Sequence, residues 1–206
     1  MAVEALDYSL HHLAVTEELL DVVQHGLPTP VATDALLGEC VARIGTAIDT
    51  YFHVRVRKAI FSGGLSKAAR NVTVPLGAVD DMVEHVVRNR DKMTRPRTHL
   101  VRAVLEKHRR QTFQGVSGVE TAASLIPITK IWKSVAHEIA DGSTAAEVES
   151  RIRELYRRRN IVVHEGAFDI GVAIRPRSLH GYRFDQAEVR RDLAWVQSFV
   201  EVVDRL

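Results

Sequence analysis

One stretch of the chain decides its fold: residues 145–166 read AAEVESRIRELYRRRNIVVHEG. Its apolar side chains recur at intervals of three and four residues, the spacing of one face of an α-helix, at Val148, Ile152 and Leu155. Just before this row, Thr144 stands three residues ahead of Glu147, which is the spacing of an N-terminal capping box. The pattern therefore predicts a helix over 145–164, ended by the glycine at 166.

An arginine continues the apolar row of this helix. The spacing leads from Leu155 to Arg159 and then to Val162, so the pattern predicts that Arg159 faces the core. A second row lies one turn round, and its members are all polar: Arg153, Arg157, Asn160 and His164. Because an unpaired buried guanidinium is costly, Arg159 must meet a carboxylate, a partner subunit or a phosphate.

Asn160 and His164 are close enough to act together, since residues four apart on a helix are neighbours. The asparagine can then fix the tautomer of the imidazole. An imidazole that exchanges a proton near neutral pH, beside an arginine that neutralises phosphate charge, suffices in principle for RNA cleavage by the 2′-hydroxyl without metal. By spacing alone, however, an arginine and a histidine on one helix are more often surface or capping groups than catalysts.

Helical periodicity continues on both sides of this stretch. It predicts an acidic helix over 3–24 and a long helix over 33–61, with a break at Gly26, Pro28 and Pro30. Further helices are predicted near 77–90, 97–111 and 128–140, with a loop around Gly115 and Gly118. The stretch near 168–177 suits either a short extended segment or a loop, and the last helix is expected to begin after Asp185.

Length and composition favour one globular domain over residues 1–206. The chain has 206 residues, of which 46% are hydrophobic and 26% charged, enough for one sizeable core. We expect an all-α bundle of about six to seven helices, in which an acidic helix (1–26) precedes the core (33–206). The absence of a signal peptide and of a long apolar run predicts a cytoplasmic protein with no membrane partner.

Charge is spread unevenly along the chain. Residues 1–40 hold seven of the 26 acids and none of the 28 lysines and arginines. Basic side chains are dense over 88–110, at Arg88, Arg90, Lys92, Arg95, Arg97, Arg102, Lys107, Arg109 and Arg110. Such a segment suits an RNA backbone, which is held by dispersed cations without sequence reading. A solvated helix face is an equally good interpretation.

Other catalytic motifs are missing from the sequence. His137-Glu138 lacks the second histidine of a zinc protease motif, and a single cysteine cannot supply a thiolate pair. Gly63-Gly64-Leu65-Ser66-Lys67 lacks the glycine spacing of a P-loop. The other histidines show no ligand spacing. We therefore predict no metal and no cofactor.

Residues 154–166, ELYRRRNIVVHEG, resemble the HEPN superfamily, especially its RiboL-PSP-HEPN-like branch. That superfamily carries an R-x4-6-H motif towards the end of a late helix, frequently with asparagine directly after the arginine. Arg159, Asn160 and His164 match this motif. The long helix with Asp49-Thr50-Tyr51-Phe52, followed by Arg55 and Arg57, also fits. In organisation the resemblance covers most of 33–206, but its residue-level specificity is concentrated in 154–166.

The resemblance implies a helical bundle that usually forms a homodimer, with two motifs in one shared cleft. In many members it implies metal-independent endoribonuclease activity in toxin–antitoxin, abortive-infection or antiviral defence, with a cognate antitoxin or defence partner. On this basis His164 acts as general base or acid, Arg159 stabilises phosphate charge and Asn160 orients the pair. RNA binding is the expected role of Arg153, Arg157 and Arg158. Asp49 is expected to contact the catalytic residues rather than the RNA.

Two alternatives stay open at this point. Some members of the superfamily have lost catalysis and only bind RNA or a partner protein through the same dimeric cleft. The other alternative is an all-helical interaction protein in which Arg159 pairs with a buried acid across the bundle. RNA cleavage in the presence of a chelator tests the first, and the stability of an Arg159→Ala variant tests the second.

Overall fold

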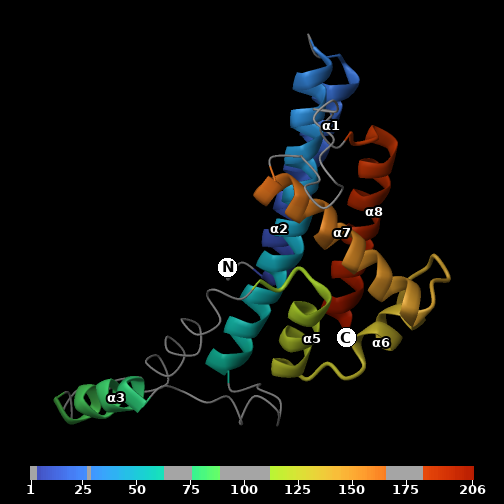
Figure 1. Ribbon diagram of the computed structural model, residues 1–206. Coiled ribbons are helices and arrows are strands. Elements are labelled where there is room, and N and C mark those ends of the chain that lie inside the picture. The colour runs from blue at the N-terminus through green and yellow to red at the C-terminus, as the bar shows by residue number, and fades with distance from the viewer. Residues whose placement is uncertain (1–3, 27–28, 63–75, 89–111, 166–182) are drawn as a thin grey trace.

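The computed structural model describes residues 4–26, 29–62, 76–88, 112–165 and 183–206 (Figure 1). These residues form α1 (Ala5–Gln24), α2 (Pro30–Ser62), α3 (Leu76–Arg88), α5 (Val116–Leu125), α6 (Ile131–Glu138), α7 (Ala145–Glu165) and α8 (Gln186–Arg205). The described part of the chain contains helices and no strand, which confirms the predicted all-α class. The helix predicted over 97–111 and the extended segment predicted over 168–177 lie outside it.

The start of α2 is set by its cap. The N–H of Ala32 donates to Oγ1 of Thr29 at 3.2 Å, so Thr29 satisfies one of the free amides of the first turn. Pro30 takes the first helical position, where a missing N–H costs nothing and the fixed φ suits the helix. The helix therefore begins before the predicted residue 33, and Pro30 starts it rather than breaking the chain.

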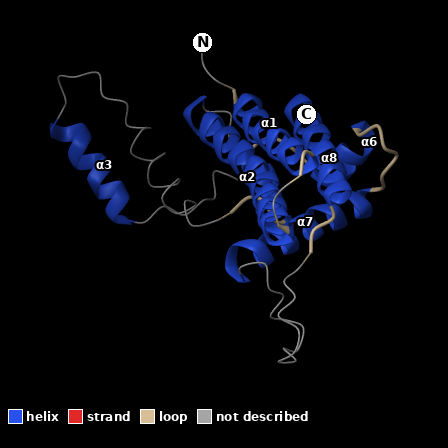
Figure 2. Ribbon diagram, turned by 90° about the horizontal axis from the view of Figure 1, so that it is seen from above, coloured by secondary structure: helices blue, strands red, loops and turns tan. Residues whose placement is uncertain are grey.

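α2 forms the centre of the bundle, and α1, α5, α7 and α8 pack around it (Figure 2). Its fully buried side chains follow the helical period predicted from the sequence: Leu37, Cys40, Val41, Ile44, Ala47, Ile48, Tyr51, Phe52 and Val56. From α1, Leu13 and Leu20 join the same core. Burial of this apolar surface is the main favourable contribution to folding. In the same views α3 stands apart from the other helices.

Polar contacts fasten α8 to the bundle at both of its ends. Near its C-terminus, Asp204 Oδ1 accepts hydrogen bonds from the Tyr51 hydroxyl at 3.1 Å and from Arg55 Nη1 at 3.3 Å. Burial raises the pKa of Tyr51 far above its ordinary value, which keeps this hydroxyl protonated as a donor. Near the N-terminus of α8, Arg190 Nη2 lies 2.8 Å from Asp21 Oδ1 on α1.

α7 and α8 begin where the sequence predicts. The N–H of Thr144 donates to Glu147 Oε2 at 2.7 Å and the N–H of Glu147 to Thr144 Oγ1 at 3.3 Å, so the capping box is confirmed. Asp185 caps α8 by accepting the N–H of Glu188 at 2.8 Å. Both starts depend on contacts three residues apart, which is why the sequence alone reveals them.

α5 occupies a region where the sequence pattern predicts a loop. Gly118 lies inside this helix, and a Cβ at that position would lie 2.2 Å from the carbonyl oxygen of Thr112. Glycine is therefore needed for the close approach of residue 112 rather than for a chain break. α6 starts at Ile131, after Lys130 with a left-handed φ of 51°, and is shorter than the predicted 128–140. None of the described helices has the length and apolar character to cross a membrane.

Candidate functional site

The arginine that α7 buries is Arg158. Its side chain is 2% exposed, and its guanidinium forms ion pairs with Glu188 at 2.6 Å and with Asp192, both on α8. The sequence pattern puts Arg159 on the core-facing row, and its stem does pack on α2 at Gly45, but the fully buried arginine is its neighbour Arg158, about 100° away round the helix. The two arginines differ because α7 contacts two helices on different sides. The side that carries Arg159 faces α2, and the side that carries Arg158 faces the carboxylates of α8. Arg158 is thus buried and paired inside the bundle rather than at the surface, and its predicted role in RNA binding stays a prediction.

Arg159 and Asn160 lie together on the half-buried side of α7. Nη1 of Arg159 donates to Oδ1 of Asn160 at 3.2 Å. The stem of Arg159 passes α2 at Gly45, where a Cβ would lie 3.1 Å from Cγ of the arginine. The missing side chain at Gly45 therefore makes room for Arg159. The structure brings two of the three motif residues together.

Gln114 occupies the other side of the space at Gly45. A Cβ on that glycine would lie 2.7 Å from Oε1 of Gln114, whose side chain is 3% exposed. Among the described residues nothing donates a hydrogen bond to this oxygen. A buried amide oxygen without a hydrogen-bond donor is uncommon. An N–H or O–H group of a bound molecule could therefore form a favourable hydrogen bond with it. Nothing in the sequence singles out this glutamine, because its position depends on the packing of α2 against residues 112–115.

Asp49 holds the segment that carries Gln114. Its Oδ1 accepts the backbone N–H of Phe113 at 2.5 Å, and Nε2 of His53 lies 3.7 Å from the same oxygen. The ring of His53 packs on that of Phe113, with 4.5 Å between their centroids. Since Gly45, Asp49 and His53 are four residues apart, they follow one face of α2. Asp49 therefore anchors the backbone beside the Arg159–Asn160 pair, and no sequence pattern points to His53 as its neighbour.

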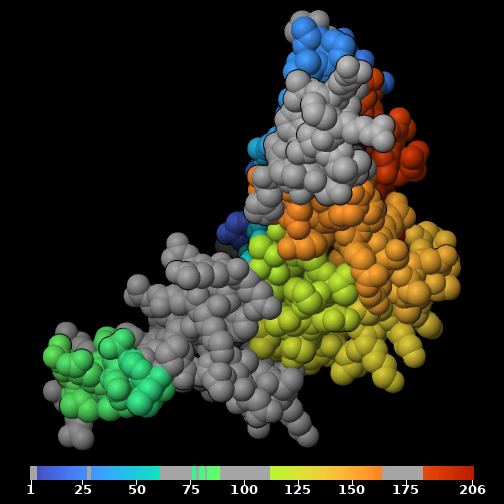
Figure 3. All heavy atoms as spheres, viewed as in Figure 1, coloured from blue at the N-terminus to red at the C-terminus, as the bar shows by residue number. Residues whose placement is uncertain are grey.

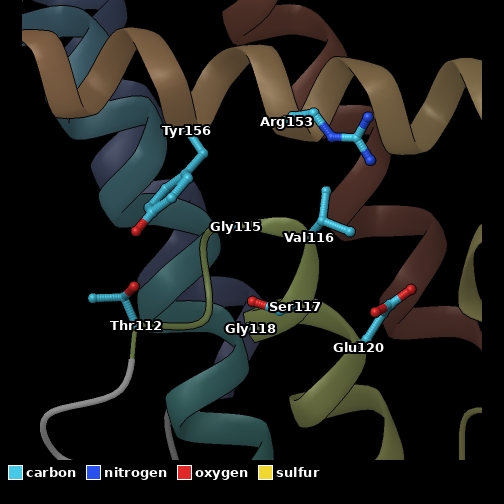
Figure 4. Close-up of a pocket in the computed structure, with 8 residues that line it drawn as sticks. All are labelled: Thr112, Gly115, Val116, Ser117, Gly118, Glu120, Arg153 and Tyr156. Atoms are coloured by element: carbon cyan, nitrogen blue, oxygen red, sulfur yellow. The ribbon is translucent and has the colours of Figure 1, made fainter.

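A cavity of about 320 Å³ opens between the start of α5 and the middle of α7 (Figure 4). Its lining comes from both helices and from the turn before α5: Thr112, Gly115, Val116, Ser117, Gly118, Glu120, Arg153 and Tyr156. The ring of Tyr156 lies over Gly115, where a Cβ would be 3.1 Å from its Cδ1. On the molecular surface α5 lies directly next to α7 (Figure 3). No sequence pattern singles out Tyr156 as a site residue, because its place beside the cavity depends on the packing of α5.

Two arginines predicted to hold RNA lie at the surface of α7. The side chain of Arg153 is 68% exposed and pairs with Glu149 at 2.5 Å. Arg157 donates to both carboxylate oxygens of Glu154, at 2.9 and 2.8 Å, and this pairing lowers the pKa of Glu154. Exposed pairs within one helix contribute little to stability. A phosphate can therefore replace either carboxylate at small cost.

His164 belongs to the last turn of α7, four residues beyond Asn160. Its side chain lies outside the part of the structure that is described, so its predicted contact with Asn160 stays a prediction. The basic segment over 88–110 also lies outside, apart from Arg88, which pairs with Glu84 on α3. Across the described ranges, no group of three histidine, cysteine, aspartate or glutamate side chains is arranged to hold a metal ion.

Comparison of the chain with protein-family models, curated proteins and solved structures gave no match. Function must therefore be inferred from α7 and its surroundings. These surroundings place a half-buried arginine–asparagine pair beside an unsatisfied glutamine oxygen, with a cavity one helical turn away.

Proposed function

We propose that this protein is a metal-independent endoribonuclease of the HEPN type. The observation that carries the proposal is the string over 154–166, in which Arg159, Asn160 and His164 match the R-x4-H pattern of that superfamily. All three residues belong to one helix, α7. The hydrogen bond of 3.2 Å from Arg159 to Asn160 supports the proposal, because it orients both polar groups on one half-buried surface.

In the proposed reaction the 2′-hydroxyl of the RNA attacks the adjacent phosphorus, and the bond to the 5′-oxygen of the next nucleotide breaks. The 2′-hydroxyl proton passes to a general base, and a general acid protonates the leaving oxygen, so that a cyclic phosphate and a 5′-hydroxyl result. His164 serves in these transfers. Arg159 stabilises the negative charge that develops on the phosphoryl oxygens, and Asn160 orients Arg159.

The active form in this proposal is a homodimer that brings two copies of α7 to one cleft. The chemistry supports this, because cleavage needs both a base and an acid while the motif of one chain supplies one histidine. Two copies of His164 supply both groups. The biological setting that goes with the proposal is toxin–antitoxin or antiviral defence, in which a cognate antitoxin or defence partner restrains the nuclease.

Cleavage of varied RNAs in the presence of a chelator tests the proposed activity. We expect the wild-type protein to produce fragments with 2′,3′-cyclic phosphate ends and His164→Ala to lower the rate by about 100-fold or more, the usual effect of losing a general acid or base. His137→Ala is the control, because it removes an exposed imidazole of α6; this variant should cut at the wild-type rate.

Two results would overturn the nuclease proposal. In one, chelated wild-type protein leaves every RNA intact; in the other, His164→Ala cuts as fast as wild type. Salt-sensitive RNA binding without products would instead favour the non-catalytic module.

A further inference from the structure

The cavity between α5 and α7 has the size of a small-molecule binding site, and close packing of its lining residues fixes its shape. Its volume of about 320 Å³ lies at the lower end of the range for small-molecule pockets, roughly 300–1,000 Å³. Two glycines fix its shape. A Cβ at Gly115 would meet the ring of Tyr156, and one at Gly118 would meet the carbonyl oxygen of Thr112. The turn before α5 can therefore pack closely under α7 only with glycine at both positions.

The lining of this cavity suits a nucleotide. Tyr156 presents an aromatic ring, and base–aromatic stacking is a main source of affinity for single-stranded nucleic acids. Thr112 and Ser117 supply hydroxyls at the edge of the cavity, and Glu120, which accepts the indole N–H of Trp132 at 2.8 Å, supplies a carboxylate. The guanidinium of Arg153 lies at the rim, where it is exposed and pairs with Glu149, and a phosphate can replace this carboxylate at small cost.

The position of the cavity links it to the Arg159–Asn160 pair. Tyr156 and Asn160 are four residues apart, which puts them on one face of α7 and about 6 Å apart along its axis. The dipeptide Gln114-Gly115 touches both places, since Gly115 lies under Tyr156 while the Gln114 oxygen lies beside Gly45, next to the stem of Arg159. One extended RNA strand along this face of α7 would therefore reach the cavity at Tyr156 and the Arg159–Asn160 pair.

We infer that this cavity is a subsite for one nucleotide of single-stranded RNA, beside the bond that the Arg159, Asn160 and His164 motif would cleave. The base stacks on Tyr156 with its edge towards Thr112 and Ser117, and the phosphate lies at Arg153. The inference rests on the proposed function, but it concerns RNA binding and can fail independently of cleavage. It makes α5 and the turn at residues 112–115 part of substrate selection.

RNA binding by a cavity-filling variant tests this subsite. The parent is full-length His164→Ala protein, so that binding is measured without cleavage, and the probe is a fluorescently labelled single-stranded RNA of mixed sequence. Ser117→Trp introduces an indole from an exposed position at the cavity wall. We expect the Kd measured by fluorescence anisotropy to rise about tenfold, as when one stacked base is lost.

The matched control is Ser124→Trp, an exposed serine of the same helix that does not line the cavity. Its Kd should stay within about twofold of the parent. Thermal melts show whether each variant is folded. If Ser117→Trp does not fold, Tyr156→Leu removes the stacking ring, and Tyr156→Phe, which keeps the ring, should restore most of the affinity.

The possible results separate the two proposals. Equal Kd values for the parent, Ser117→Trp and Ser124→Trp would overturn the subsite while cleavage by the wild type still stands. Equal losses for Ser117→Trp and Ser124→Trp would also overturn it, because the effect would then not be specific to the cavity. Absence of both RNA binding and wild-type cleavage would overturn the subsite and the nuclease together.

Discussion

Two neighbouring arginines of α7 have opposite environments. Arg158 is enclosed between α7 and α8, where Glu188 and the 6%-exposed Asp192 neutralise it. Arg159 lies half-buried beside Gly45 and donates to Asn160. Successive residues of an α-helix point about 100° apart. Arg158 therefore has a structural role in the core, while Arg159 belongs to the candidate site.

Substitution of each arginine separates these roles. Arg158→Met keeps most of the buried volume but leaves the Asp192 carboxylate without its cation, so the free energy of unfolding should fall by about 3–5 kcal/mol. Arg159→Ala removes a half-buried side chain and its hydrogen bond to Asn160, which should cost about 1 kcal/mol. Urea unfolding of both variants measures the difference. If the free energy of unfolding falls as much for Arg159→Ala as for Arg158→Met, Arg159 has a structural role. That result would favour the alternative of an all-helical interaction protein over the nuclease.

At the scale of single elements, α5 depends on the glycine inside its first turns. Gly118 allows the carbonyl of Thr112 to approach the helix so closely that a Cβ would lie 2.2 Å from that oxygen. The atom is backbone and cannot rotate away, so the helix or the preceding turn must shift. The same shift would change the cavity that these residues line.

We expect Gly118→Ala to lower the free energy of unfolding by about 1–3 kcal/mol, because it overpacks this contact. Gly77→Ala on α3 is the control, since a Cβ there would meet nothing within 4 Å; alanine is the better helix former, so stability should stay equal or rise slightly. Urea unfolding curves of the two variants provide the comparison. A Gly118→Ala protein as stable as wild type would contradict this prediction. It would show that the backbone at residue 112 can move away from the added Cβ without a cost in free energy.

At the scale of the whole molecule, the packing of α1 on α2 makes stability depend on pH. Burial lowers the pKa of His12 below its ordinary value of 6.5, and the nearby charges of His11 and Arg43 lower it further. The unfolded chain then binds the proton more readily than the native protein. The contribution to stability is therefore complete above about pH 6.5, near the pKa in the unfolded chain, and is lost as the pH falls from there towards the lower pKa of the folded protein.

The free energy of unfolding should accordingly fall between about pH 7.5 and pH 5.5, and His12→Gln should show a smaller fall. His137→Gln, an exposed change on α6, should keep the wild-type dependence. Urea unfolding at several pH values gives the slopes. Equal slopes for wild type and His12→Gln would show that this imidazole takes up its proton as easily in the folded protein as in the unfolded chain.

Local patterns predicted much of the fold. The capping box of Thr144 and Glu147 and the cap at Asp185 involve residues three apart, so they are visible in the sequence and mark the true starts of α7 and α8. The start of α2 is equally local, because Thr29 caps the amide three residues on, but the two prolines at 28 and 30 make the sequence pattern favour a break there. The pattern predicts a loop at α5 because Gly118 suggests a chain break, and its contact with residue 112 is visible only in the structure.

The sequence by itself determined the all-α class, the long helix at the centre of the bundle and the motif residues on one late helix. These depend on the helical period and on caps, which are interactions between near neighbours. Only the tertiary structure decided that Arg158 is fully buried while Arg159 is half-buried, that Gln114 lies beside Gly45, and that α5 and α7 line a cavity. The physical reason is that burial depends on which distant segment covers each side of a helix, and the period of one helix does not contain that information.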